Sequence, residues 1–195
     1  MKKISIIVLM LLILTNSCSN QQYKLNNYIN YPIKFAKQEI KYPNGDFSLS
    51  IPLNWEWKVE TYGNEKIILG IDAGSKTNMD GFIDILSVQK LKSFGEKTDL
   101  KSEFDYYLEL QQTNWNGEVI ETGETEIFGE KAYFLHTKSN TRTYGETESI
   151  NFILNSKTRG VFYNLTASAS QTDELKKNMA ILIQCLRTFK KKNSE

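Results

Sequence analysis

The chain has 195 residues, of which 40% are hydrophobic and 24% are charged. Its 24 basic and 23 acidic side chains leave no basic excess to neutralise phosphates, so nucleic-acid binding is disfavoured. Two cysteines and one histidine are too few for a disulfide framework or a His/Cys metal cluster.

The first 17 residues have the three-part pattern of a secretory signal peptide. Lys2 and Lys3 give a positive start, residues 4–14 are apolar except for Ser5, and a short polar stretch follows. The apolar run is about half of the roughly 20 residues that a transmembrane helix needs. We therefore expect residues 1–17 to be cleaved off, which leaves 22 basic and 23 acidic side chains in the mature chain.

The stretch that ends in Ser17-Cys18 resembles the lipobox of bacterial lipoproteins. The resemblance implies cleavage before Cys18 and attachment of diacylglycerol to its thiol. Thr15 and Asn16 depart from the usual leucine and small residue at these places, so simple secretion and an uncleaved anchor remain alternatives. Two or more acyl chains hold a protein stably on a membrane. Ser19 in place of aspartate favours the outer membrane over the inner one in this family.

Residues 18–42 are predicted to be the lipidated N-terminus and a tether, because the stretch is rich in Asn and Gln and contains Pro32. Ile33, Phe35 and Ile40 could dock on the domain and shorten the tether. The domain is expected over residues 43–190, and residues 191–195 form a polar tail.

Within this domain, apolar and polar residues alternate in short runs between turn signals, which predicts β-strands. Two stretches instead have helical spacing, one after Thr98 as the expected N-cap and one after Thr172-Asp173-Glu174. This pattern indicates an α+β architecture. The expected strands are residues 47–51, 66–72, 82–90, 119–128, 131–139, 146–155 and 161–167, and the expected helices are residues 98–111 and 172–189.

Three segments together resemble the PsbP-like and DcrB-like proteins. They are Phe47–Trp55, with its strand-Pro-x-x-Trp pattern, the hairpin Ile127–Ala132, and Tyr163–Ala167 with the amphipathic helix that follows. The resemblance implies an α/β/α sandwich with a central, mostly antiparallel sheet flanked by helices. It also implies a binding protein without catalytic machinery or cofactor, and it transfers no site residue.

The residues offer little catalytic chemistry. The single histidine, His136, lies in an apolar strand and is interpreted as a hydrogen-bonded structural residue. Cys185, on an apolar helix face, is interpreted as a buried side chain. The nucleophile elbow, the Walker-type loop and the dinucleotide fingerprint are absent from the sequence.

Carboxylates cluster along the chain in two places. Asp72, Asp80 and Asp84 flank one loop, but their spacing does not match an EF-hand, so a solvated loop is favoured over calcium binding. A second group lies on expected neighbouring strands and is interpreted as exposed sheet-face charge paired with Lys131, Lys138 and Arg142 rather than as a glycosidase pair. This second group is Glu121, Glu124, Glu126, Glu146 and Glu148.

The aromatic residues supply the candidate binding residues. Trp55 is expected to pack in the core, whereas Trp57, Tyr62 and Trp115 are candidates for exposed contacts. The leading hypothesis is a non-enzymatic, lipid-anchored protein of the bacterial envelope that binds another protein as scaffold, accessory or immunity factor. The alternative is a small-ligand or glycan-binding lipoprotein. An enzyme that uses His136 beside a carboxylate is the third hypothesis.

Overall fold

The computed structural model describes residues 22–78, 81–113, 117–141 and 145–192. Its centre is a seven-stranded sheet in the order β3-β4-β5-β9-β8-β7-β6, and all neighbouring strands are antiparallel. The strands are β3 (Glu56–Val59), β4 (Ile67–Gly74), β5 (Ile85–Lys92), β6 (Glu118–Thr125), β7 (Ala132–Thr141), β8 (Gly145–Asn155) and β9 (Val161–Ser170).

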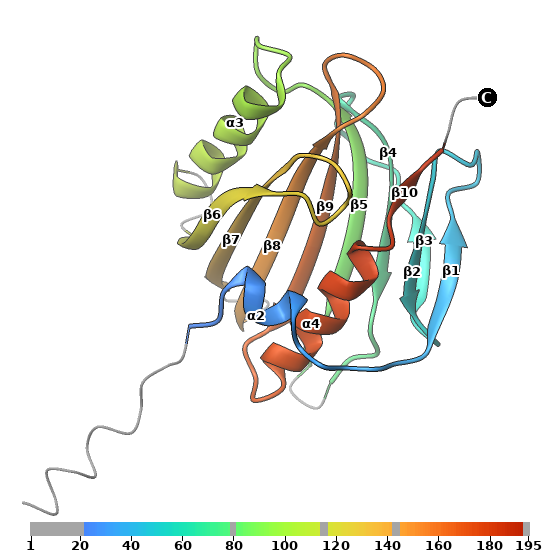
Figure 1. Ribbon diagram of the computed structural model, residues 1–195, viewed down its shortest axis with the longest axis vertical. Coiled ribbons are helices and arrows are strands. Elements are labelled where there is room, and N and C mark those ends of the chain that lie inside the picture. The colour runs from blue at the N-terminus through green and yellow to red at the C-terminus, as the bar shows by residue number, and fades with distance from the viewer. Residues whose placement is uncertain (1–21, 79–80, 114–116, 142–144, 193–195) are drawn as a thin grey trace, which may run out of the picture.

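Helices cover both faces of this sheet (Figure 1). Helix α4 (Leu175–Leu186) and the short helix α2 (Leu25–Ile29) lie on one face, and α3 (Leu100–Thr113) lies on the other. A small sheet in the order β1-β2-β10 packs beside α4 and extends the first layer. Its strands are β1 (Lys37–Lys41), β2 (Phe47–Pro52) and β10 (Lys190–Lys191). The predicted α/β/α sandwich is confirmed.

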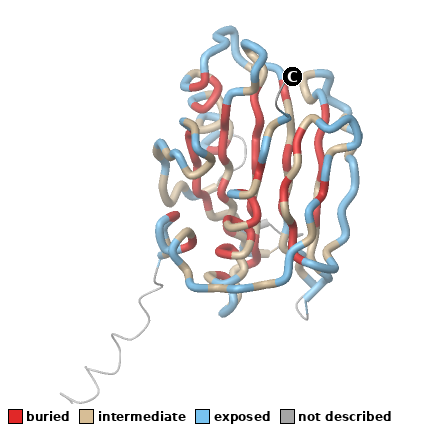
Figure 2. Tube along the Cα trace, turned by 45° about the vertical axis from the view of Figure 1, so that its right-hand side comes forward, coloured by how far each residue is buried: buried red, intermediate tan, exposed pale blue. Residues whose placement is uncertain are grey.

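Strand alternation explains why both faces are covered. On β8, Ile150, Phe152 and Leu154 are fully buried toward α4, while Ile153 faces the cluster under α3. Buried positions therefore follow the central strands, and exposed positions gather in the loops and at the surface (Figure 2). The expected meander of four strands is confirmed as β6-β7-β8-β9.

The helix starts show one local difference from expectation. Asp99, not Thr98, caps α3, because its carboxylate accepts the backbone N–H of Ser102 at 2.9 Å. Strand β3 at the edge of the large sheet and strands β1 and β10 of the small sheet were not predicted. Each is short, and β10 consists of two lysines that pair with β2.

The predicted tether over residues 18–42 is shorter in the structure, because residues 25–41 pack on the domain. Leu25 is 4% exposed and Tyr28 fully buried, and both belong to the core beneath α4. Ile40 is buried in β1, while Ile33 and Phe35 pack against the same core. Hydrophobic burial of these side chains outweighs the flexibility suggested by the polar composition.

We expect Leu25→Ala to lower the free energy of unfolding by about 2–4 kcal/mol, because it removes a buried side chain from the core. The neighbouring exposed Asn26→Ala should change it by about 0.5 kcal/mol or less. Urea denaturation of both variants measures this difference. Equal stability of the two variants would contradict the docking of α2.

Candidate functional site

The most chemically distinctive region lies where α2 meets strands β6, β7 and β8. Strand alternation points His136 and Lys138 of β7, together with Glu146 and Glu148 of β8, toward the α2 and α4 side. The register places Lys138 directly between Glu118 of β6 and Glu148 of β8. Charged side chains from three neighbouring strands therefore form one row.

Glu148 is the centre of a buried hydrogen-bond network. Its Oε2 lies 2.9 Å from the Nε2 of His136 and accepts the hydroxyl of Tyr28 at 2.9 Å. Its Oε1 accepts the side-chain amide of Gln171 at 2.8 Å. Burial alone would raise the pKa of Glu148. The hydrogen bond and the electrostatic interaction with His136, together with the hydrogen bonds from Tyr28 and Gln171, lower this pKa by more than burial raises it. The pKa of Glu148 therefore ends below its ordinary value.

This network ties the N-terminal segment to the sheet. The Tyr28 ring meets the His136 ring edge-on at 5.8 Å, and the backbone N–H of Leu25 donates to Glu121 at 2.9 Å. Burial and the adjacent Glu148 raise the pKa of Tyr28, so its hydroxyl stays protonated as a donor. Four separate segments of the chain thus meet at one carboxylate.

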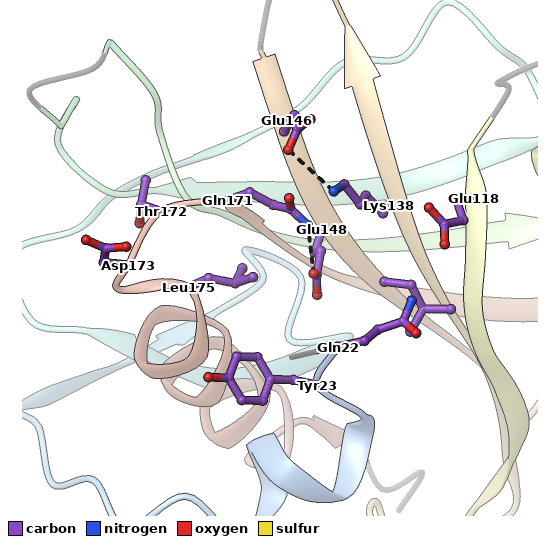
Figure 3. Close-up of a pocket in the computed structure, with 11 residues that line it drawn as sticks. Gln22, Tyr23, Glu118, Lys138, Glu146, Glu148, Gln171, Thr172, Asp173 and Leu175 are labelled. Carbon is purple, nitrogen blue, oxygen red and sulfur yellow. Dashed lines mark hydrogen bonds and ion pairs between the residues drawn. The ribbon is translucent and has the colours of Figure 1, made fainter. Parts of the chain in front are cut away.

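Beside this network opens a cavity of about 580 Å³ (Figure 3). We call it the acidic cavity, since its described lining residues include the carboxylates of Glu118, Glu146, Glu148 and Asp173 but one basic side chain, Lys138. Lys138 lies 3.4 Å from Glu146. The remaining lining residues are Gln22, Tyr23, Ile120, Gln171, Thr172 and Leu175.

His136 lies beneath the acidic cavity and does not open into it. His136 is fully buried and is not part of the lining, so it reaches the cavity only through Glu148. Within the described residues, no group of three His, Cys, Asp or Glu side chains could hold a metal ion. The arrangement is suited to binding a positively charged group, because several carboxylates that line one concave surface concentrate negative potential.

Several interpretations made from the sequence can be compared with these positions. His136 is a hydrogen-bonded structural residue, and Cys185 is buried, with its pKa raised to about 12 by that burial; both interpretations are confirmed. The interpretation of Glu148 as an exposed charge is wrong, since it is 4% exposed. Lys131–Glu124 and Lys138–Glu146 do form the expected surface pairs.

The candidate aromatic residues do not converge on one groove. Trp57 is 39% exposed and pairs with Ala73 of β4, whose side chain belongs to the core beneath α4. The Tyr62 hydroxyl lies on the side of Gly70 where a side chain would point. Gly70 and Ala73 are three residues apart on β4, so these two positions face opposite sides of the sheet. Tyr62 and Trp57 therefore lie on opposite faces. Trp55 packs on the core as expected. Trp115 and Cys18 lie outside the described residues, as do Asp80 and Arg142.

Sequence reasoning missed Tyr28, Gln171, Glu118 and Asp173 as parts of the site. A signal for Glu148 was present, because it precedes the inward-facing Ile150 by two residues and therefore shares its face. Residues 22–31 also contain apolar side chains at helical spacing, such as Leu25 and Tyr28, within a polar stretch. Gln171 lies in a turn, and its direction depends on the tertiary fold.

Replacing Tyr28 with phenylalanine should lower the free energy of unfolding by about 1–3 kcal/mol, because a buried carboxylate loses one donor. Tyr23→Phe is the matched control, since it keeps the ring that lies near Lys176 and should be nearly neutral. Urea denaturation at neutral pH measures both. A neutral Tyr28→Phe variant would show that the hydroxyl does not stabilise the ionised carboxylate.

Glu148 should also make stability depend on pH. Its pKa in the folded state is below the unfolded value of about 4.3, so the ionised carboxylate stabilises the fold above that pH. This contribution is lost as pH falls through the folded pKa. We therefore expect the stability gap between the wild type and Glu148→Gln to narrow on acidification. A gap that stays constant between about pH 7 and about pH 3 contradicts this assignment.

The PsbP family model matches residues 38–191 of the chain. A search of curated proteins finds no significant match. Among solved structures, cyanobacterial PsbP from Synechocystis has a TM-score of 0.58 at 12% identity, covering 84% of this chain and 96% of that one. The Ran-binding protein Mog1p of Saccharomyces cerevisiae has a TM-score of 0.51 at 11% identity, covering 80% and 96%.

A third similar structure is LpqN, involved in cell envelope biogenesis of Mycobacterium tuberculosis. Its TM-score is 0.51 at 12% identity, with coverage of 87% of this chain and 97% of that one. Identities this low establish a shared fold and do not transfer a function.

Proposed function

The chain belongs to the PsbP family, and from this premise we propose that it is a lipid-anchored protein of the bacterial envelope whose domain binds another protein without catalysing a reaction. The observation that carries the proposal is the acidic cavity, a concave surface rich in carboxylates beside the N-terminal segment. The partner contributes a basic segment to this cavity. The identity of this partner decides whether the chain acts as a scaffold, an accessory or an immunity-type protein.

The positions of the reactive side chains support a non-catalytic role. The His136 ring and the Cys185 thiol are both fully buried, so neither reaches a substrate in the acidic cavity. Glu148 has its two oxygens engaged by Tyr28, His136 and Gln171. A general acid or base must be within hydrogen-bond reach of the proton that it transfers.

The charge of the acidic cavity supports a protein partner. Glu118, Glu146 and Asp173 are exposed at its opening, and Lys138 offsets only part of their charge. Complementary charge raises association rates and selects partners at such surfaces. Lysine and arginine side chains of a partner satisfy both requirements, because they reach into a cavity while their backbone stays outside.

The envelope location rests on the sequence before the described residues. The signal peptide over residues 1–17 and the lipidated Cys18 place the domain on a membrane surface, with the outer membrane favoured by Ser19. No helix within the described part of the chain has the length and apolar character to span a bilayer. The envelope role of LpqN, a protein of the same fold, is compatible with this location.

The alternative, a small-ligand or glycan-binding lipoprotein, has weaker support. Trp57 lines a shallow hollow of about 450 Å³ with Ile83 and Ile85, which offers an aromatic surface for a ligand. Tyr62 lies on the opposite face of the sheet and does not contribute to this hollow. A ligand there would therefore rest on Trp57 alone among the described candidate residues.

Substitution of Cys18 by alanine tests the anchor. After a high-salt wash, we expect the wild-type protein to fractionate with membranes and the Cys18→Ala protein to appear in the soluble envelope fraction, because the acyl chains provide the stable attachment. Metabolic labelling with palmitate should give a signal for the wild type only. A Cys18→Ala protein that still resists extraction from membranes at high salt would refute the lipid anchor.

The binding surface is tested by a pair of substitutions that remove two carboxylate charges from the acidic cavity. Glu118→Gln with Glu146→Gln should reduce recovery of a cross-linked partner from membranes by about tenfold, given ~0.7 kcal/mol for each exposed charge pair. The control, Glu65→Gln with Glu96→Gln, removes the same charge from exposed sites elsewhere. Quantitative mass spectrometry compares the two. Equal recovery with both double variants would exclude the acidic cavity as the binding surface.

A further inference from the structure

One face of the domain combines lysines with half-buried aromatic rings near the proposed lipid anchor. It is formed by residues 22–37 and by the outer side of α4 (Figure 1). Residues 22–37 include α2 and the segment that runs from α2 across α4 to β1. We call the whole surface the lysine face. Its lysines are Lys24, Lys34, Lys37, Lys176 and Lys177, of which all but the half-buried Lys176 are exposed.

The charge of the chain is divided unevenly between this face and the rest. Residues 22–37 contain three lysines and no acidic side chain, and residues 173–187 contain three basic and two acidic ones. The remainder of the mature chain holds 16 basic and 21 acidic side chains. The segments that form the lysine face therefore carry a net charge of +4, against −5 for the remainder of the mature chain.

Aromatic rings lie beside two lysines of this face, whereas Lys177 pairs with Glu174. The ammonium of Lys176 lies 4.9 Å from the ring centre of Tyr23 and 5.4 Å from that of Tyr31. The ammonium of Lys37 lies 4.8 Å from the ring of Phe35. Cationic heads beside aromatic rings are the composition found where proteins meet the headgroup level of a membrane.

A hollow of mixed polarity adjoins Phe35. It has a volume of about 400 Å³, and its lining combines apolar side chains with polar ones. The apolar ones include Phe35, Leu53, Trp55 and Ile181, and the polar ones are Asn54, Ser75, Asp84 and Asn178. Leu53 is 48% exposed and so presents apolar surface to solvent beside this hollow. An amphipathic surface of this kind gains free energy at an interface where apolar and charged groups meet.

The short distance along the chain from the anchor keeps the lysine face near the membrane. Five peptide units separate Cys18 from Tyr23, and an extended chain spans at most about 3.6 Å for each residue, or about 18 Å. Tyr23 contacts Lys176 and so lies at the border of the lysine face. A lipid on Cys18 therefore holds this side of the domain close to the membrane.

We infer that the lysine face lies against the anionic phospholipid headgroups of the membrane to which Cys18 is anchored, and so orients the domain. The inference rests on the proposed lipid anchor. Tyr23 also lines the acidic cavity, whose carboxylates the same headgroups repel. The resulting tilt brings α4 toward the membrane and leaves the acidic cavity open to a protein partner.

The test uses the mature chain, residues 18–195, carrying Cys18→Ser, so that binding does not depend on lipid attachment. Vesicles of phosphatidylcholine alone are compared with vesicles that also contain phosphatidylglycerol, in a sedimentation assay. We expect binding to the second kind only, with loss at high salt because the charges are screened.

Two double variants then locate the contact. Lys34→Gln with Lys37→Gln should weaken binding by about 25-fold, since each lysine near an anionic surface contributes about 5-fold. Lys92→Gln with Lys97→Gln removes equal charge from exposed positions outside the lysine face and should change binding less than about twofold. All four lysines are exposed, so both variants are expected to fold.

Two outcomes would overturn the inference: no binding to phosphatidylglycerol vesicles, or equal losses in both double variants. Either would leave the lipid anchor standing, because fractionation of the Cys18→Ala protein reports lipid attachment alone. Conversely, vesicle binding by the Cys18→Ser chain would persist even if Cys18 proved to be unmodified in cells.

Discussion

A carboxylate removed from water needs donors around it, and in this protein those donors come from parts of the chain that are far apart in sequence. Glu148 of β8 is bound by Tyr28 of α2, His136 of β7 and Gln171, which precedes α4. An ionised carboxylate without such partners would cost several kcal/mol in an apolar interior. The network therefore requires α2 to be docked, and the docked α2 in turn fixes where the N-terminal anchor meets the domain.

The position of α2 links location to function. Because residues 25–41 belong to the fold, only a short segment separates Cys18 from the packed domain. Gln22 and Tyr23, just before α2, line the acidic cavity, and Tyr23 also borders the lysine face. In the proposed arrangement, the oppositely charged surfaces on the two sides of Tyr23 orient the domain on an anionic membrane, with the proposed partner-binding surface turned away from it.

Hydrophobic periodicity predicted the strands and helices whose apolar residues repeat regularly. It did not predict the elements that are stabilised mainly by tertiary contacts. The runs around Ile150–Leu154 and Leu175–Leu186 alternate or repeat clearly, and both became the expected elements. Strand β3 is exposed along its length, so its sequence carries no buried stripe to detect. Helix α2 is five residues long and is stabilised by packing and by the hydrogen bond from Tyr28 to Glu148. Neither contact can be inferred from the composition of the segment.

The site was less predictable than the fold for a related reason. Individual strands suggested carboxylates on neighbouring strands, and Glu146 and Glu148 do lie beside Lys138. The sequence did not indicate that Glu118, Asp173 and Gln22 would join them, because the register of β6 against β7, a loop and the N-terminal segment bring them there. The aromatic candidates Trp57 and Tyr62 were chosen by residue type, and the sheet places them on opposite faces.

Site-specific photo-crosslinking in living cells examines the central claim most directly. A photoreactive amino acid replaces Glu118 at the acidic cavity or, in a control protein, Glu65 on an exposed turn. The account predicts one reproducible protein adduct from position 118, absent from position 65, and lost when Cys18→Ala releases the domain from the membrane. Adducts with lipid alone from position 118, or the same protein adduct from both positions, would contradict it.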